Sequence, residues 1–230
     1  MNRRDIVAGL AAAATATQVR AQDRDIVAYD YFFIRNLPQQ RPTLMAFING
    51  TLRGLTRAAN GEIIGVFTAQ LGWDSTELAV LIRWRGLGGD PSAINLALQH
   101  APGVASFERH PLLATARAGR DQPLQPGGIY VHRWFEIKPS EREEFVRLSA
   151  EGWVDFEKKF DAKIFGLMAE VQPRPKNPNL WILLLTRYGS HQVWEASRDP
   201  TTDAMKSFQR RAQLTLSSRG CSTLLAPQPA

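Results

Sequence analysis

The chain has 230 residues, of which 44% are hydrophobic and 22% charged, and its formal net charge is +6. This length suits two units of about 100 residues, each with its own core. Basic residues alternate with acidic ones instead of forming long blocks, so we expect no nucleic-acid partner. The single cysteine, Cys221, excludes an intrachain disulfide and a zinc site of cysteine type.

Residues 1–21 are typical of an export signal and not of a folded segment. Arg3-Arg4 precedes a short Ala-rich stretch, and the paired arginines favour the twin-arginine route. We therefore expect cleavage after Ala21 and a periplasmic or secreted protein. The alternative is a basic, disordered N-terminus on a cytoplasmic protein. The later apolar runs have the length of strands, so we expect no stable membrane anchor after signal removal.

The chain contains an internal duplication. Ile63-Ile64-Gly65-Val66 returns 101 residues later as Ile164-Phe165-Gly166-Leu167. Other pairs keep the same order while their spacing grows: Pro38 and Pro139, Arg83-Trp84 and Arg187-Tyr188, Asp90-Pro91 and Asp199-Pro200, and Leu112-Leu113-Ala114 and Leu224-Leu225-Ala226. A constant order with small insertions indicates one supersecondary unit used twice.

The first unit spans residues 22–116 and alternates strand and helix patterns. In chain order it predicts a strand at 29–37, a helix at 42–59, a strand hairpin at 62–70 and 78–85, a short helix at 91–99 and a closing strand at 112–115. Residues 117–128 are rich in glycine, proline and glutamine, which predicts a linker.

The second unit spans residues 129–230 and repeats this plan. Strands are predicted at 130–137, 163–171, 180–188 and 222–226, with a Pro-rich hairpin loop at 173–179. Ser140 and Glu143 form a capping-box pattern, which predicts the start of the first helix. Asp199-Pro200 predicts the start of the second helix.

The order strand, helix, strand, strand, helix, strand is the ferredoxin-like plan, in which both helices cover one face of an antiparallel sheet. Strands this apolar need a cover on their other face as well. We therefore predict an α+β fold in which two tandem ferredoxin-like units pack sheet to sheet as an α/β barrel within one chain.

The stretch 130–139 resembles the first strand of NIPSNAP-domain proteins, which belong to the dimeric α/β-barrel superfamily. Arg133, Phe135 and Pro139 fit that strand's arginine, aromatic residue and closing proline. The segments 183–188 and 194–198 resemble the family's third strand and the turn after it. The usual acidic residue two before the arginine is Val131 here, so no role of that carboxylate carries over. The resemblance covers 129–226 and implies no single reaction.

Arg133 lies in mid-strand among apolar neighbours, where an unpaired charge is costly. It therefore either faces a polar ligand cavity or pairs with an acid such as Glu170. Strand alternation places Phe135 on the same face and His132 on the opposite one. The resemblance favours the Arg133 face as the inner one, with His132 packed under the helices.

Arg187-Tyr188 has a counterpart in the first unit, so Arg187 is either architectural or, if functional, grips a carboxylate with its planar guanidinium. His191 and Trp194 lie in an insertion of five residues that the first unit lacks. Function can be added at such an insertion, and the alternative is an extra helical turn that caps the barrel mouth. We predict His191 as a proton donor, and the superfamily resemblance adds a haem ligand as a less favoured role.

Three functional hypotheses follow. The first is an exported protein that binds a small hydrophobic or aromatic anion in the barrel without a cofactor. The resemblance implies the second, a cofactor-free oxygenase or isomerase, or a haem enzyme. The third is a non-catalytic interaction protein that uses the barrel as a rigid body. A homodimer through sheet edges or helix faces is compatible with each of them.

Overall fold

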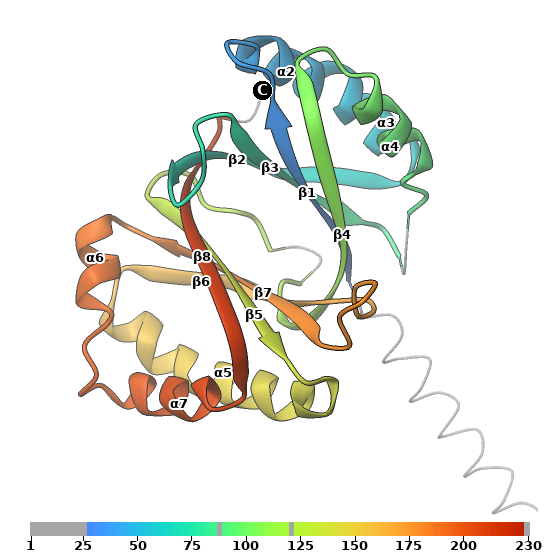
Figure 1. Ribbon diagram of the computed structural model, residues 1–230. Coiled ribbons are helices and arrows are strands. Elements are labelled where there is room, and N and C mark those ends of the chain that lie inside the picture. Colours follow the sequence, from blue (N-terminus) through green and yellow to red (C-terminus); the bar gives the residue numbers. More distant parts are fainter. Residues whose placement is uncertain (1–26, 87–88, 120–121, 228–230) are drawn as a thin grey trace, which may run out of the picture.

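The protein, as a computed structural model, is described for residues 27–86, 89–119 and 122–227. Figure 1 shows two helical layers on the outside of a closed barrel of strands. The predicted export signal at 1–21 lies outside the described residues. Within these residues, no helix is both long and apolar enough to span a membrane.

The first unit follows the predicted order of elements. It consists of β1 (Ala28–Asn36), α2 (Arg41–Phe47), the π-helical turn η1 (Ile48–Leu52), α3 (Arg53–Ala58), β2 (Gly61–Leu71), β3 (Glu77–Trp84), α4 (Ser92–Gln99) and β4 (Val104–Arg117). The predicted helix at 42–59 is confirmed as one continuous helical stretch with a π-helical turn in its middle. The closing strand β4 is much longer than the predicted 112–115, because it pairs with β1 along its first part and with β6 along its last part.

The second unit repeats this order. It consists of β5 (Ile129–Ile137), the 3₁₀ turn η2 (Pro139–Glu141), α5 (Arg142–Lys159), β6 (Ala162–Glu170), β7 (Leu180–Tyr188), α6 (His191–Ala196), α7 (Asp203–Ala212) and β8 (Thr215–Leu225).

Both predicted helix starts in the second unit need correction. Ser140 lies inside the 3₁₀ turn, and α5 begins at Arg142 without a side-chain cap. The Asp199 carboxylate accepts the backbone N–H of Thr201 at 2.9 Å and so forms a turn instead of a helix cap. The helix α7 begins only after Thr202, whose hydroxyl accepts the N–H of Met205.

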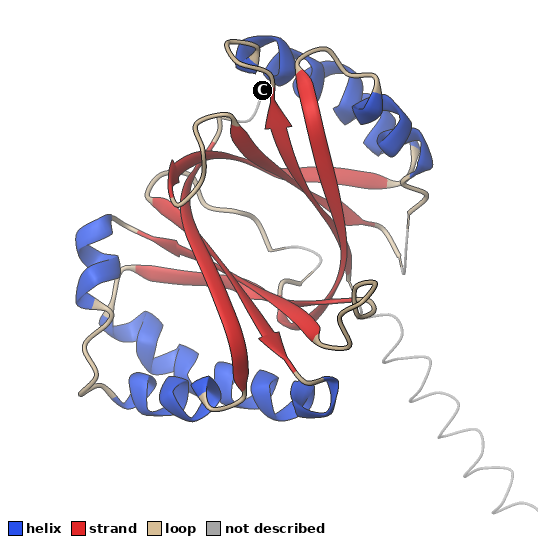
Figure 2. Cartoon of the chain, viewed as in Figure 1, coloured by secondary structure: helices blue, strands red, loops and turns tan. Residues whose placement is uncertain are grey.

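The eight strands form a closed barrel in the order β1-β3-β2-β8-β5-β7-β6-β4, with antiparallel pairing throughout. Each unit keeps the ferredoxin-like order of its own strands, and the closing strand of each unit pairs with the second strand of the other. Figure 2 shows the two sheets facing each other, with the helices outside. The predicted packing of two units sheet to sheet is therefore confirmed.

Side chains alternate along β5 as predicted, but the predicted assignment of the faces is wrong. His132 points into the barrel, where it contacts Tyr31 and Phe67 of the first unit. Arg133 and Phe135 lie between the sheet and the helices of the second unit. Both faces of β5 carry large apolar side chains, so the sequence pattern alone cannot tell which face turns inward.

Candidate functional site

A cavity of about 540 Å³ lies between the sheet of the second unit and its helices. Strands β5, β7 and β8 form its floor, and α5, α6 and α7 cover it. Apolar rings make up much of its wall: Phe135, Trp153, Phe156, Trp194 and Phe208. Arg133 and Phe135, which were predicted to line a cavity inside the barrel, instead line this cavity on the helix side of the sheet.

Local sequence explains why the helices lie over this floor. The apolar stripe of α5 turns toward the sheet and includes Phe145, Leu148 and Phe156. Gly152 lies on the same stripe, and a Cβ atom there would come within 2.8 Å of the Phe208 ring. The glycine therefore allows α7 to pack close against α5.

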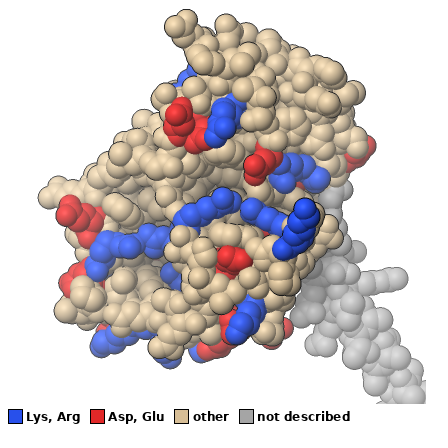
Figure 3. All heavy atoms as spheres, in the orientation of Figure 1, with Lys and Arg blue, Asp and Glu red and all other residues tan. Residues whose placement is uncertain are grey.

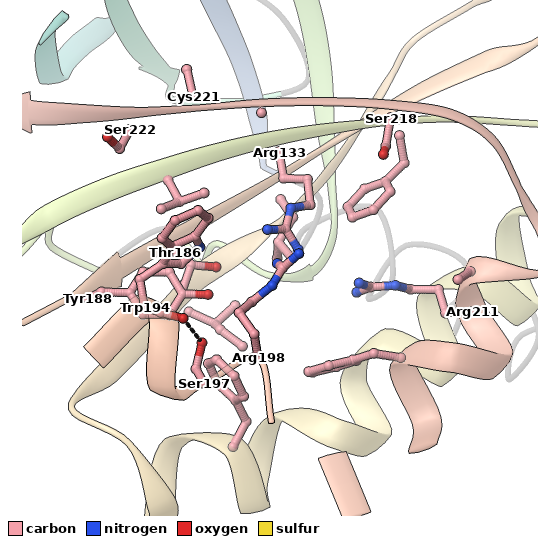
Figure 4. Close-up of a pocket in the computed structure, with 18 of the residues that line it drawn as sticks. Arg133, Thr186, Tyr188, Trp194, Ser197, Arg198, Arg211, Ser218, Cys221 and Ser222 are labelled. Carbon is pink, nitrogen blue, oxygen red and sulfur yellow. Dashed lines mark hydrogen bonds between the residues drawn. The ribbon is translucent and has the colours of Figure 1, made fainter. Parts of the chain in front are cut away.

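Three arginines extend into the cavity. Arg133 comes from β5, Arg198 from the turn after α6 and Arg211 from α7, and Figure 4 shows their guanidinium groups turned toward the same space. Arg219 also borders the cavity, but its guanidinium lies over the rings of Trp134 and Trp181 on the barrel side of the sheet. Among the described residues that line the cavity, none is an aspartate or a glutamate.

The same sign of charge extends to the outside. Arg198 is exposed, so the positive charge reaches the opening of the cavity. Figure 3 shows Lys and Arg side chains gathered in a band across one face of the molecule. A positive opening raises the local concentration of anions.

Arg211 is only 5% exposed and is surrounded by aromatic rings. Its guanidinium carbon lies 4.7 Å from the centre of the Phe135 ring and 4.8 Å from that of Phe208. It donates one hydrogen bond, of 3.3 Å, to Ser149 Oγ. Burial, assisted by the charge of Arg133, lowers the pKa of Arg211 to about 9, so the group is still charged at neutral pH.

Several buried donors in this region have no acceptor. Trp153 Nε1, Trp194 Nε1 and Arg211 Nε are buried without a hydrogen-bond partner among the described residues. All three residues line the cavity. A buried donor without an acceptor costs about 1–3 kcal/mol, so these three donors destabilise the unit in the absence of a partner.

Arg133 has room on one side because its neighbour on β8 is Gly220. A Cβ atom at Gly220 would meet only the carbonyl oxygen of His132, at 3.5 Å. Burial and the charge of Arg198 lower the pKa of Arg133. Burial raises the pKa of the neighbouring Tyr188 phenol, while Arg133 and Ser197 oppose the shift.

The cavity brings together four of the residues predicted from the sequence, which are Arg133, Phe135, Tyr188 and Trp194. Glu170 is not among the lining residues. Its carboxylate contacts His110 Nδ1 at 3.1 Å and Arg174 at 2.6 Å, so the alternative pairing of Arg133 with Glu170 is wrong.

Arg187 also lies away from the cavity. It donates hydrogen bonds to the carbonyl oxygen of Gly127 at 3.1 Å and to Asp161 at 3.3 Å. Its counterpart Arg83 contacts the carbonyl oxygen of Gln122 at 3.4 Å. Both repeated arginines therefore hold the segment between the units, which favours the architectural alternative.

His191 is the first residue of α6 and does not line the cavity. Its ring centre lies 6.5 Å from that of Trp194. A catalytic role for His191 stays a prediction. The insertion forms the extra helix α6, as the alternative expected, but this helix lies over the helix-side cavity, to which it supplies Trp194 and the turn after it supplies Arg198.

The described lining residues include no histidine, so they do not fit a haem held by a histidine ligand. Among the described residues, no cluster of His, Cys, Asp and Glu has the arrangement of a metal site.

The sequence interpretation missed Arg198, Arg211 and Trp153. Arg211 lies in the last turn of α7, where a basic residue is expected to interact with the helix dipole. However, it also lies three residues after Phe208 on the buried stripe of α7. An arginine on an apolar stripe was the signal that could have identified it.

No family model matches the chain, and no curated protein matches it. Solved structures do match. A protein from Lactobacillus acidophilus NCFM, provisionally named a monooxygenase, is 12% identical with a TM-score of 0.59, over 89% of this chain and 97% of its own. An anthrone oxidase-like protein is 14% identical with a TM-score of 0.58, over 90% and 93%.

A variant of chlorite dismutase from Candidatus Nitrospira defluvii is 8% identical, with a TM-score of 0.57 over 88% of this chain and 92% of its own. The chain has the dimeric α/β-barrel fold. Here both halves of the barrel come from one chain. At these identities the comparison shows the fold alone, so the activity has to be argued from the cavity.

Proposed function

We propose that the cavity in the second unit binds a small aromatic anion, such as an aromatic carboxylate or a phenolate. The observation that carries the proposal is the cavity's excess of donors. Arg133, Arg198 and Arg211 converge in it, and no acidic residue is among its described lining residues. The ring of the ligand would lie against apolar walls such as Phe135 and Phe156.

The energetics favour an anion over a neutral ligand. Arginine binds carboxylates through paired, charge-assisted hydrogen bonds, which are about twice as strong as neutral ones. A bound anion would also offset the repulsion between Arg133 and Arg211. The volume of about 540 Å³ lies within the range of small-molecule sites.

Calorimetric titration of the purified protein tests the proposal, with 1-naphthoate as the anion and 1-naphthamide as its neutral analogue. We expect naphthoate to bind and naphthamide to bind at least tenfold more weakly. Arg133→Met and Arg198→Met should each weaken naphthoate binding about tenfold or more. Arg210→Met is the matched control, because Arg210 lies beside Arg211 but contacts Glu151 on the exposed side of α7.

Equal binding of the two naphthalene ligands would contradict the proposal. So would unchanged naphthoate affinity in both cavity variants. The second unit's cavity would then be a packing defect and not a site.

A cofactor-free oxygenase or isomerase is a second candidate. Tyr188 favours it, because its phenol lines the cavity and interacts electrostatically with Arg133, which is expected to hold the ligand oxygen. Oxygen uptake with a dihydroxynaphthalene substrate tests this candidate. Uptake that Tyr188→Phe abolishes would support it, and the absence of uptake in the presence of bound ligand would reject it.

We also propose that the chain is an exported relative of the NIPSNAP-domain proteins. Arg133, Phe135 and Pro139 support the relationship, and Arg3-Arg4 supports export. Sequencing the N-terminus of the protein recovered from the periplasm tests export. A mature chain that begins at Gln22 is expected, and an intact N-terminus in the cytoplasmic fraction would contradict export.

A further inference from the structure

The barrel interior holds a second cavity, of about 260 Å³. It lies on the opposite face of β8 from the first cavity, and both units contribute to it. Aromatic and imidazole rings form its wall: Tyr31, Phe33, Trp73, His110, His132 and Trp134. Glu108 and Arg219 are exposed lining residues. The first three rings and His110 come from the first unit, so the site exists only because the two units form one barrel.

The rings form a box in which neighbours meet at steep angles. The centres of the Tyr31 and Trp134 rings are 5.4 Å apart with an interplanar angle of 84°. Those of Phe33 and Trp73 are 5.2 Å apart at 71°. Edge-to-face packing of this kind also suits a planar guest, and each such ring pair contributes about 0.5–1.5 kcal/mol beyond area burial.

The hydrogen-bond network fixes the polarity of the inner wall. Thr223 Oγ1 donates to the carbonyl oxygen of Tyr130 at 3.1 Å, so its oxygen accepts from His132 Nε2 at 2.9 Å. The proton of His132 is therefore assigned to Nε2, and Nδ1 accepts the Tyr31 hydroxyl at 2.9 Å. The Tyr31 hydroxyl donates its hydrogen to this bond, so its oxygen still has lone pairs that can accept a hydrogen bond from a ligand.

Burial lowers the pKa of His132 to about 3, so the ring is neutral near pH 7 and this direction of hydrogen bonding persists. Burial also raises the pKa of Cys221, which lines the cavity, to about 12, so its thiol stays protonated and is a poor nucleophile. The inner wall is thus aromatic and neutral, with a phenol oxygen as an acceptor. This cavity differs in character from the donor-rich cavity on the helix side.

We propose that the barrel cavity binds a neutral planar aromatic molecule of one or two fused rings that carries one hydrogen-bond donor, of the indole or phenol type. Its ring would fit between Trp73 and Trp134, and its N–H or O–H would donate to Tyr31 Oη. A volume of about 260 Å³ is smaller than that of a site for a drug-sized ligand, which limits the guest to this size. The proposal does not rest on anion binding in the first cavity.

Proton–nitrogen correlation NMR of the full chain tests the proposal, because four of the six tryptophans line the two cavities, two in each. Titration with indole should shift the side-chain N–H signals of Trp73 and Trp134, which line the barrel cavity. The signals of Trp153 and Trp194, which line the other cavity, should stay unchanged. The analogue 1-methylindole lacks the N–H and should bind at least tenfold more weakly than indole.

Trp73→Ala should weaken indole binding at least tenfold, and Trp194→Ala is the matched control that should leave it unchanged. Trp73 lies in the loop between β2 and β3 and is partly exposed, so its removal should preserve the fold. Shifts confined to Trp153 and Trp194 would overturn the proposal, as would equal binding of indole and 1-methylindole. The comparison of indole with 1-methylindole uses the unmodified protein, so it tests the proposal even if Trp73→Ala fails to fold.

Discussion

Tyr31 Oη lies 2.9 Å from His132 Nδ1 at the centre of the barrel, and the two residues occupy the same position in the two units, 101 residues apart. The duplicated first strands therefore meet each other through equivalent side chains. Two separate subunits would place two copies of one residue at this point. Joining both units in one chain allows a tyrosine to face a histidine, which is a complementary donor and acceptor pair.

Removing this hydrogen bond should destabilise the barrel. Tyr31→Phe leaves His132 Nδ1 buried without a donor, and we expect the free energy of unfolding to fall by about 1–3 kcal/mol. Guanidinium unfolding measures the loss. Phe33→Leu is the comparison variant, because it changes a partly buried ring of the same strand without removing a hydrogen bond. A loss no larger than that of Phe33→Leu would show that the pair contributes little.

Stability should fall in acid because His132 resists protonation. Its pKa is about 3 in the folded protein, against 6.5 as the ordinary value, so the unfolded chain binds the extra proton first. Between these values the free energy of unfolding should decrease by up to about 1.4 kcal/mol per pH unit as pH falls. His132→Gln should remove this contribution, whereas His100→Gln, at an exposed position, should not. Equal pH slopes in the wild type and His132→Gln would contradict the assignment.

The fold was predictable because the repeat fixes the order of elements twice. Two ferredoxin-like sheets with apolar faces can satisfy both faces only by packing together, and the barrel follows. The inward face of β5 was not predictable, because Tyr130 and Trp134 on one face are as apolar as Phe135 on the other. The resemblance to the NIPSNAP-domain strand predicted that the Arg133 face of β5 turns inward, which is wrong.

The site was predictable only in part, for a related reason. Arg133 stood out as a charge within an apolar strand. Arg211 looked like an ordinary basic residue at a helix end, and its role depends on how α7 packs against α5. The position of α7 in turn depends on Asp199, whose carboxylate forms a turn and delays the helix to Asp203. Local sequence patterns do not show how two helices pack against each other, so they could not predict the position of Arg211.

Arg211→Met should make the unliganded protein more stable while it weakens anion binding. The substitution removes a buried charge that lies near Arg133, and we expect a gain on the order of 1 kcal/mol. Thermal unfolding and calorimetric titration with 1-naphthoate measure the two effects. Arg210→Met, on the exposed side, should change neither by a comparable amount. A variant that is less stable and binds naphthoate normally would show that Arg211 serves the fold.

Filling the cavity from its floor should block binding without unfolding the protein. Gly220→Leu introduces a side chain beside Arg133, where a Cβ atom meets only the carbonyl oxygen of His132. We expect at least tenfold weaker naphthoate binding and little change in melting temperature. Gly166→Ala is the contrasting variant, because its Cβ would collide with Ala118 and should lower the melting temperature. Undiminished naphthoate binding in Gly220→Leu would place the ligand elsewhere.

Arg133, Arg198 and Arg211 are proposed to hold an anion against the aromatic wall of the helix-side cavity. Proton–nitrogen correlation NMR tests this most directly, because it follows the side-chain N–H signals around the cavity during titration with 1-naphthoate. We predict that the signals of Trp153 Nε1, Trp194 Nε1 and Arg211 Nε shift together and saturate at one ligand per chain. If naphthoate binds while these three signals stay unchanged, or if it does not bind, the account of this cavity is wrong.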